Sequence, residues 1–138
     1  LIPGENDSGS ELDAMTRWVV EHLGPDVPMH ITAFHPDWKM RDIERTPAAT
    51  LGMARDIARA NGVRYAYTGN VHDPAGGSTW CHSCGELLIE RDWHRLGRWG
   101  LDSRGCCTAC GCALPGHFDG KPEQRELRPM RVRLRQVS

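Results

Sequence analysis

Two CxxCG motifs limit the folds open to this 138-residue chain. Cys81 and Cys84 form the first motif, Cys107 and Cys110 form the second, and 22 residues lie between the motifs. The glycine after each motif permits the positive φ that a tight turn around a ligand sulfur needs. Four thiolates from two such turns make a tetrahedral site that suits zinc, with iron as the alternative. We therefore predict a structural four-cysteine metal centre that holds Zn²⁺.

Two further cysteines leave alternatives open. Cys106 and Cys112 could be bystander thiols, alternative ligands or, in a secreted protein, disulfide partners. All six cysteines lie within 32 residues, whereas disulfides that stabilise a whole domain would connect distant parts of the chain. A reducing compartment therefore fits better. We expect His82, inside the first motif, to be a surface residue. His94 and His117 are weaker ligand candidates than the four paired cysteines.

Composition narrows the class of protein. A formal net charge of -1 and a hydrophobic content of 39% are typical of a globular protein, with no basic excess that would indicate nucleic acid as a partner. No apolar run approaches the roughly 20 residues that span a bilayer, and no secretory signal pattern is present. We therefore expect a cytoplasmic protein with no membrane partner. Leu1–Gly4 has the pattern of a buried strand entering a turn, which favours the C-terminal part of a longer chain.

The first half of the chain alternates between helical and strand patterns. Apolar residues recur at helical spacing from Leu12 to Leu23, with Ser10 as the expected N-cap, and a second helix is expected from Pro47 onward with Thr46 as its N-cap. Residues 29–34 and 63–68 have strand patterns. This order predicts an α/β fold in which parallel strands are joined by right-handed crossovers.

Polar loops follow the predicted strand ends, where barrels and open sheets alike bind ligands. They are residues 5–7, 35–37 and 69–73. Within the middle strand His30 and Thr32 share one face, opposite Met29, Ile31 and Ala33. His30 is then either a side chain that lines a barrel or crevice, or a core histidine bonded to the backbone.

The remaining sequence divides into two regions. A segment rich in glycine, residues 73–78, is a plausible hinge between residues 1–73 and a small metal ribbon at residues 74–119. Apolar residues of the ribbon, including Leu88, Trp93 and Trp99, would supply its core, and the metal would supply the remaining stability. The tail, residues 120–138, has a formal charge of +4 and could form an exposed strand, although a solvated extension is the commoner state.

Four features occur together in one order: Leu1–Asp7, Pro28–Pro36, Tyr65–Asn70 and the paired CxxCG motifs. Together they resemble the C-terminal half of the AmmeMemoRadiSam system radical SAM proteins, which are similar to pyruvate formate-lyase activating enzymes. The likeness covers residues 1 to about 119. It implies the C-terminal part of a partial (β/α) TIM-like barrel, followed by a rubredoxin-like zinc ribbon.

The resemblance also implies chemistry. Such proteins cleave S-adenosylmethionine reductively at a [4Fe-4S] cluster, and the resulting 5′-deoxyadenosyl radical abstracts hydrogen from a substrate, here unknown. The CxxxCxxC motif that holds the cluster is absent, since Cys106 and Cys110 have the first interval but Ala113 occupies the third position. We therefore expect no radical chemistry from this polypeptide without the N-terminal half of the barrel. By their place at strand ends, Asn6, His30 and His35 are expected to approach S-adenosylmethionine or the substrate.

Two other functions fit the motifs. The ribbon and basic tail could form a binding module for nucleic acid or a protein partner, although the net charge makes nucleic acid the weaker expectation. An iron-loaded four-cysteine site could transfer electrons, as rubredoxins do. Zinc is colourless and redox-silent, whereas iron in such a site is coloured, so the identity of the metal separates these interpretations.

Overall fold

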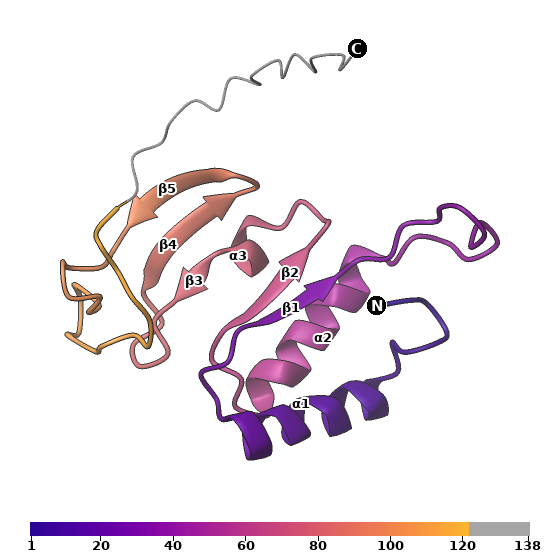
Figure 1. Ribbon diagram of the computed structural model, residues 1–138, viewed down its shortest axis with the longest axis horizontal. Coiled ribbons are helices and arrows are strands. Elements are labelled where there is room, and N and C mark those ends of the chain that lie inside the picture. Colours follow the sequence, from indigo (N-terminus) through magenta and orange to yellow (C-terminus); the bar gives the residue numbers. More distant parts are fainter. Residues whose placement is uncertain (122–138) are drawn as a thin grey trace, which may run out of the picture.

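The computed structural model describes residues 1–121. These residues form a mixed α/β structure with two short sheets, and no closed barrel exists within them (Figure 1). In chain order the elements are α1 (Gly9–Leu23), β1 (Met29–Thr32), α2 (Ala48–Ala60), β2 (Ala66–Gly69), α3 (Pro74–Gly77), β3 (Thr79–Trp80), β4 (Leu87–Asp92) and β5 (Arg95–Trp99). The strand predicted near residue 132 lies outside the described part of the chain.

The first sheet is parallel, as the alternating sequence pattern predicts. β1 pairs with β2 so that His30 lies opposite Tyr67. The N-terminal residue lies on the other side of β1, because the Leu1 amino group donates to the Thr32 carbonyl at 2.6 Å and the Leu1 carbonyl accepts from the Phe34 amide at 3.1 Å. This is the hydrogen-bond pattern of a parallel neighbour. The backbone therefore runs in the same direction at Leu1, β1 and β2.

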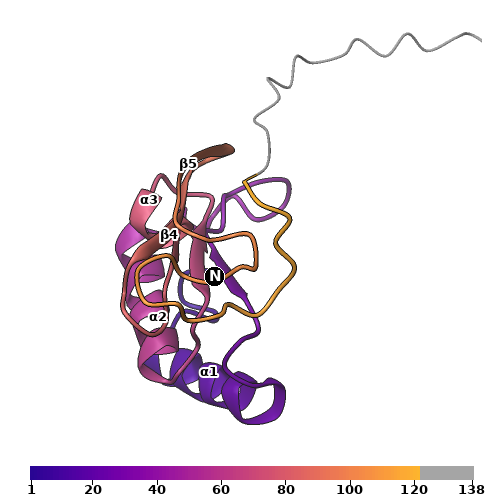
Figure 2. The same ribbon diagram turned by 90° about the vertical axis from the view of Figure 1, so that its left-hand side faces the viewer.

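Helices α1 and α2 cover one face of this sheet. Leu12 of α1 and Leu51 of α2 are 1% and 0% exposed, and they pack with Ile31 of β1 and Ala66 of β2. Figure 2 shows α1 and α2 on the same side of the molecule. Side chains of β1 alternate as expected, because Ile31 is buried and His30 is exposed. The face that carries His30 has no helix over it among the described residues.

Both predicted N-caps were wrong. The cap of α1 is Ser8, whose Oγ accepts from the Glu11 amide at 3.3 Å, while Ser10 already lies in the first turn. Pro47 occupies the N-cap position of α2. The buried Thr46 instead joins two other segments: its Oγ1 donates to the Leu1 carbonyl at 2.7 Å and accepts from the Phe34 amide at 2.8 Å. A tertiary contact therefore replaces the local one.

The predicted hinge contains a packed helical turn. The Asp73 carboxylate caps α3 by accepting from the Gly76 amide, and it also accepts from the Thr68 hydroxyl, both at 2.9 Å. Gly76 is buried, and a Cβ at this position would come within 2.1 Å of Asp73 and 2.3 Å of Thr68. These contacts fix the start of the ribbon against the end of β2.

The second sheet is antiparallel, in the order β3-β4-β5, and it belongs to the ribbon. Leu88 is 0% exposed at the centre of a second core, which includes Leu101 and the first cysteine of each motif. Tyr65, just before β2, packs into the same core. The ribbon therefore rests directly on the parallel-sheet unit.

None of the helices within residues 1–121 has the length and hydrophobicity needed to cross a membrane.

Candidate metal centre and adjoining cleft

The four cysteines of the two motifs meet at one point. Their Sγ atoms all lie within 4.8 Å of one another. Cys81 and Cys110 are separated by 3.7 Å, and Cys84 and Cys107 by 3.8 Å. A tetrahedron with metal–sulfur bonds of about 2.3 Å has sulfur–sulfur edges of about 3.8 Å, whereas a disulfide bond is about 2.0 Å long. The predicted ligand set could therefore hold one tetrahedral metal ion.

The two motifs have equivalent backbone structure. The Gly85 amide donates to the Cys81 carbonyl at 2.9 Å, and the Gly111 amide donates to the Cys107 carbonyl at 2.8 Å. The amides of Cys81 and Cys107 each donate to the carbonyl five residues later, at 2.8 Å in both motifs. In each motif the first cysteine is buried and the second is exposed. Two matching turns thus present sulfurs from opposite sides of the same point.

Substitution of the glycine in the second motif tests the geometry of these turns. Gly111 has a φ of 75°, and a Cβ there would meet no atom within 4 Å. We expect Gly111→Ala to destabilise the metal-bound protein by about 1 to 2 kcal/mol, because the left-handed backbone disfavours any side chain. Urea unfolding measures this loss.

Gly52→Ala is the matched control, since Gly52 lies within α2, has open space at its Cβ and no positive φ. There the same change should stabilise the protein by about 0.5 to 1 kcal/mol. A Gly111→Ala protein as stable as the wild type would contradict the geometry of the second motif.

The sulfurs also influence one another's ionisation. Burial acts to raise the pKa of Cys81, but hydrogen bonds from the Cys84 and Ser83 amides outweigh it and hold the pKa at about 7. At Cys84 a hydrogen bond from the Glu86 amide lowers the pKa, yet the neighbouring sulfurs, Cys110 first, raise it to about 12. Like charges in close contact oppose one another's ionisation. A cation among the four sulfurs would remove this opposition.

Neither of the other cysteines belongs to this cluster. All six thiols are free of disulfides, and the Cys106 amide, rather than its sulfur, makes the contact that places it, with Asp102 at 2.9 Å. The Cys112 sulfur lies 3.3 Å from Nε2 of His82, whose Nδ1 lies 3.1 Å from the Tyr65 hydroxyl. His82 is half-buried by these contacts, so it is less exposed than we predicted.

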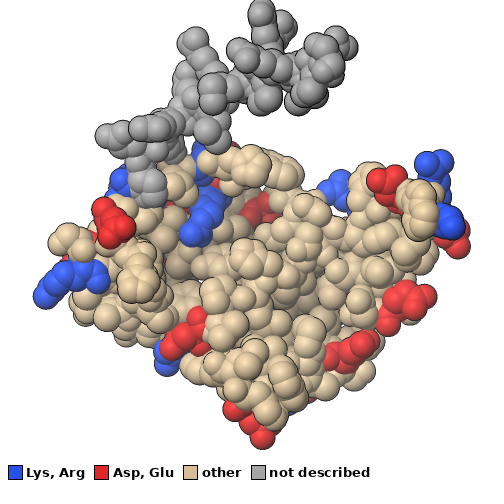
Figure 3. Space-filling model, in the orientation of Figure 1, with Lys and Arg blue, Asp and Glu red and all other residues tan. Residues whose placement is uncertain are grey.

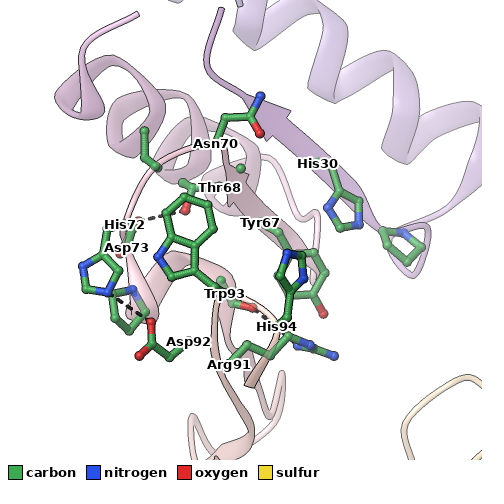
Figure 4. A pocket seen from close by; sticks show the side chains of 15 residues that line it. His30, Tyr67, Thr68, Asn70, His72, Asp73, Arg91, Asp92, Trp93 and His94 are labelled. Carbon is green, nitrogen blue, oxygen red and sulfur yellow. Dashed lines mark hydrogen bonds and ion pairs between the residues drawn. The ribbon is translucent and has the colours of Figure 1, made fainter. Parts of the chain in front are cut away.

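A cleft of about 670 Å³ lies where the ribbon meets the parallel sheet (Figure 4). β2, the loop after it and the tip of the β4–β5 hairpin all contribute to its walls. Its lining includes His30, Tyr67, Asn70, His72, Asp73, Arg91, Asp92, Trp93 and His94. Its volume lies within the range of about 300 to 1,000 Å³ that is usual for small-molecule sites.

The residues predicted from strand ends are not brought together. His30 lines the cleft, on the exposed face of β1. The Asn6 side chain instead accepts a hydrogen bond from the Ile2 amide at 2.7 Å and closes a local turn. His35 is exposed in the long loop after β1, and neither residue lines the cleft among the described residues. The part of these three residues in binding S-adenosylmethionine or a substrate stays a prediction.

No hairpin residue was predicted to line this cleft; His94 was considered only as a weaker metal-ligand candidate, and it is not part of the four-cysteine group. Asp92, Trp93 and His94 enter the cleft from the ribbon, although they lie more than 60 positions from His30 in the sequence. Their pattern contains no catalytic motif, and only the packing of the ribbon on β2 brings them to the cleft.

Comparison with known proteins gives one informative relative. The chain is 43% identical over 91 residues to "Uncharacterized protein MJ0808" of Methanocaldococcus jannaschii. The matched region covers 66% of this chain but only 27% of that relative, so the chain spans about a quarter of its length. No family model matches the chain, and no solved structure matches it. The name of that relative states no function.

Proposed function

We propose that this chain forms the C-terminal part of a radical S-adenosylmethionine barrel and that its four-cysteine centre is a structural zinc site. The main support is the open face of the parallel sheet, which would be the inner face of such a barrel. Helices cover the Ile31 face, whereas His30 and Tyr67 on the opposite face line a large cleft. In α/β barrels the inner face and the carboxyl-end loops carry the active site. The order Leu1, β1, β2 is that of consecutive barrel strands.

The zinc assignment rests on the donor set. Four sulfurs at tetrahedral spacing, with no oxygen or nitrogen donor in the cluster within residues 1–121, suit a closed structural site better than a catalytic one. A catalytic zinc keeps one position open for water or substrate. The centre would hold the ribbon together and thereby fix the wall of the cleft.

The described residues do not supply the iron–sulfur cluster that radical chemistry needs. Cys110 belongs to the four-cysteine group, and Ala113 stands where the third cysteine of a CxxxCxxC motif would be. The proposal therefore requires another polypeptide segment to hold the cluster. When bound, the cluster and S-adenosylmethionine would supply the radical. The contribution of this chain is to bind and orient the substrate and to exclude water beside His30.

A binding module for nucleic acid or a protein partner is the second candidate. In the view of Figure 3, lysine and arginine side chains are interspersed with acidic ones, mostly around the rim, and the middle of this face is largely uncharged. Nucleic-acid binding surfaces instead gather positive charge in a continuous patch. This face gives that candidate no support.

The test uses the longest protein encoded in frame with this segment. Produced without oxygen and supplied with iron and sulfide, it should form 5′-deoxyadenosine from S-adenosylmethionine after addition of dithionite. We expect His30→Ala to lower the initial rate by about tenfold, which corresponds to the loss of one good hydrogen bond at the site. Liquid chromatography measures the nucleoside.

His22→Ala is the matched control, since His22 is an exposed histidine that stacks on Trp18 of α1, away from the cleft. It should leave the rate unchanged. His35→Ala and Asn6→Ala test the two residues outside the cleft. A protein that binds no iron–sulfur cluster and forms no 5′-deoxyadenosine would contradict the proposed function.

A further inference from the structure

The tip of the β4–β5 hairpin holds a tryptophan in an unfavourable backbone conformation. Asp92 pairs with Arg95, which leaves Trp93 and His94 as the two central residues of the turn. Trp93 has a φ of 52°, and glycine is preferred at the first central position when φ there is positive. The side chain is 62% exposed, so burial in the ribbon core does not explain its position.

The indole instead forms part of the cleft, where flat rings from both units of the fold meet. Trp93 stacks on His72, with ring centroids 6.4 Å apart and planes inclined by 23°. Nearer β1, His30 stacks on Tyr67 at 5.2 Å and 29°. All four line the same cleft (Figure 4). A planar aromatic ligand would extend these stacks on the ring faces that the pairs leave free.

The end of β4 is also tied to the parallel-sheet unit. Nε2 of His72 lies 3.0 Å from the Asp92 carboxylate, and the Arg91 guanidinium lies over the Tyr67 ring at 5.6 Å from its centroid. Arg91 also donates to Thr79 Oγ1 at 2.7 Å. The hairpin tip is therefore held against β2 rather than left to swing in solvent.

The acidic side chains of the cleft and two of its histidines differ in whether they already have hydrogen-bond partners. Both acidic side chains already have partners, because Asp73 accepts from Thr68 and from the Gly76 amide, and Asp92 pairs with His72. By contrast, the structure gives the ring nitrogens of His30 and His94 no hydrogen-bond partner within residues 1–121. Donors are thus available to a ligand while the carboxylates are occupied. This difference favours an acidic group on the ligand.

We infer that the metal ribbon supplies one wall of a binding site for a planar aromatic compound with an acidic group, a carboxylate or a phosphate. Trp93 stacks on the aromatic ring from the ribbon side, and Tyr67 contacts it from β2. His30 and His94 donate hydrogen bonds to the acidic group. Binding of such a compound requires no radical chemistry, so it can be tested apart from S-adenosylmethionine cleavage.

The test measures calorimetric binding of 2-naphthoate to the zinc-loaded chain. We expect one site, and we expect Trp93→Gly to weaken binding by about tenfold, the usual size of one aromatic stacking contact. The same change should raise the melting temperature, because glycine accepts the positive φ at this turn. A rise in stability together with a loss of affinity separates a binding role from a structural one.

The acidic group is tested by His30→Gln and His94→Gln. Each should weaken binding of 2-naphthoate by about threefold or more and leave the uncharged 2-naphthamide unaffected. A parallel titration with 2-naphthyl phosphate identifies the preferred acid: tighter binding than 2-naphthoate assigns a phosphate, and weaker binding assigns a carboxylate.

Trp18→Ala is the control for loss of an exposed indole, since Trp18 is 53% exposed on α1 and does not line the cleft. This variant should bind 2-naphthoate and 2-naphthamide with the same affinities as the wild type. The inference is overturned if 2-naphthoate does not bind at millimolar concentration, or if Trp93→Gly binds it as tightly as Trp18→Ala does. Equal affinity for 2-naphthoate and 2-naphthamide would contradict the claim that the site recognises an acidic group.

Discussion

Replacement of Cys107 by serine is expected to unfold the ribbon. Cys107 is a metal-ligand candidate that is only 2% exposed, and it also packs in the ribbon core beside Leu88 and Leu101. In small zinc modules metal binding contributes apparent free energies of about 10 to 16 kcal/mol, which exceeds what a core of this size could replace. Amide signals of β4 and β5 in a ¹⁵N–¹H correlation spectrum should therefore collapse to the range typical of unfolded chains. Chelation of the metal from the wild type should have the same effect.

Cys112→Ser is the matched control for this experiment. Cys112 lies two residues beyond the Cys110 ligand candidate; its sulfur contacts His82, and it is not one of the four clustered cysteines. This variant should retain one metal ion per chain and the dispersed signals of the ribbon. Retention of the ribbon spectrum in Cys107→Ser, or in the fully chelated wild type, would show that the fold does not depend on the metal.

Leu51→Ala is expected to destabilise the parallel-sheet unit by about 2 to 5 kcal/mol. Leu51 is 0% exposed between the two helices and the sheet, where it packs with Leu12 and Ile31. Loss of its side chain would leave a cavity that neighbouring alanines of α2 are too small to fill. Urea unfolding followed by far-ultraviolet circular dichroism measures the loss.

Met53→Ala provides the comparison on the same helix. Met53 is 42% exposed, so its truncation should change stability by no more than about 0.5 kcal/mol. Both variants should keep the metal, since neither residue contacts the ribbon core. Equal stability of the Leu51→Ala and wild-type proteins would mean that the helices do not pack on the sheet as described.

Local patterns were sufficient to predict several features of the fold. The spacing of the CxxCG motifs identified the four cysteines that converge, because tight turns and tetrahedral coordination depend on residues close in sequence. The two-residue alternation of β1 predicted that His30 and Ile31 lie on opposite faces, and the structure shows that His30 is the exposed one. The parallel pairing of β1 with β2 followed from the helix between them.

Long-range contacts account for what the sequence did not predict. Thr46 has a good capping side chain, yet it bonds to Leu1 and Phe34, which no local pattern reveals. The glycines of α3 indicated a hinge, but Asp73 caps the segment and Gly76 fits where no Cβ would. Trp93 was assigned to the ribbon core on its hydrophobicity, whereas the hairpin turn carries it into the cleft. The closure of a barrel around this sheet stays a prediction.

X-ray absorption at the metal edge tests the four-sulfur centre most directly. The purified chain should contain one zinc ion, and its spectrum should fit four sulfur neighbours at about 2.3 Å with no light-atom ligand. This expectation rests on the four sulfurs of Cys81, Cys84, Cys107 and Cys110, which all lie within 4.8 Å of one another. A first shell that contains nitrogen or oxygen, or a protein that folds with no bound metal, would contradict it.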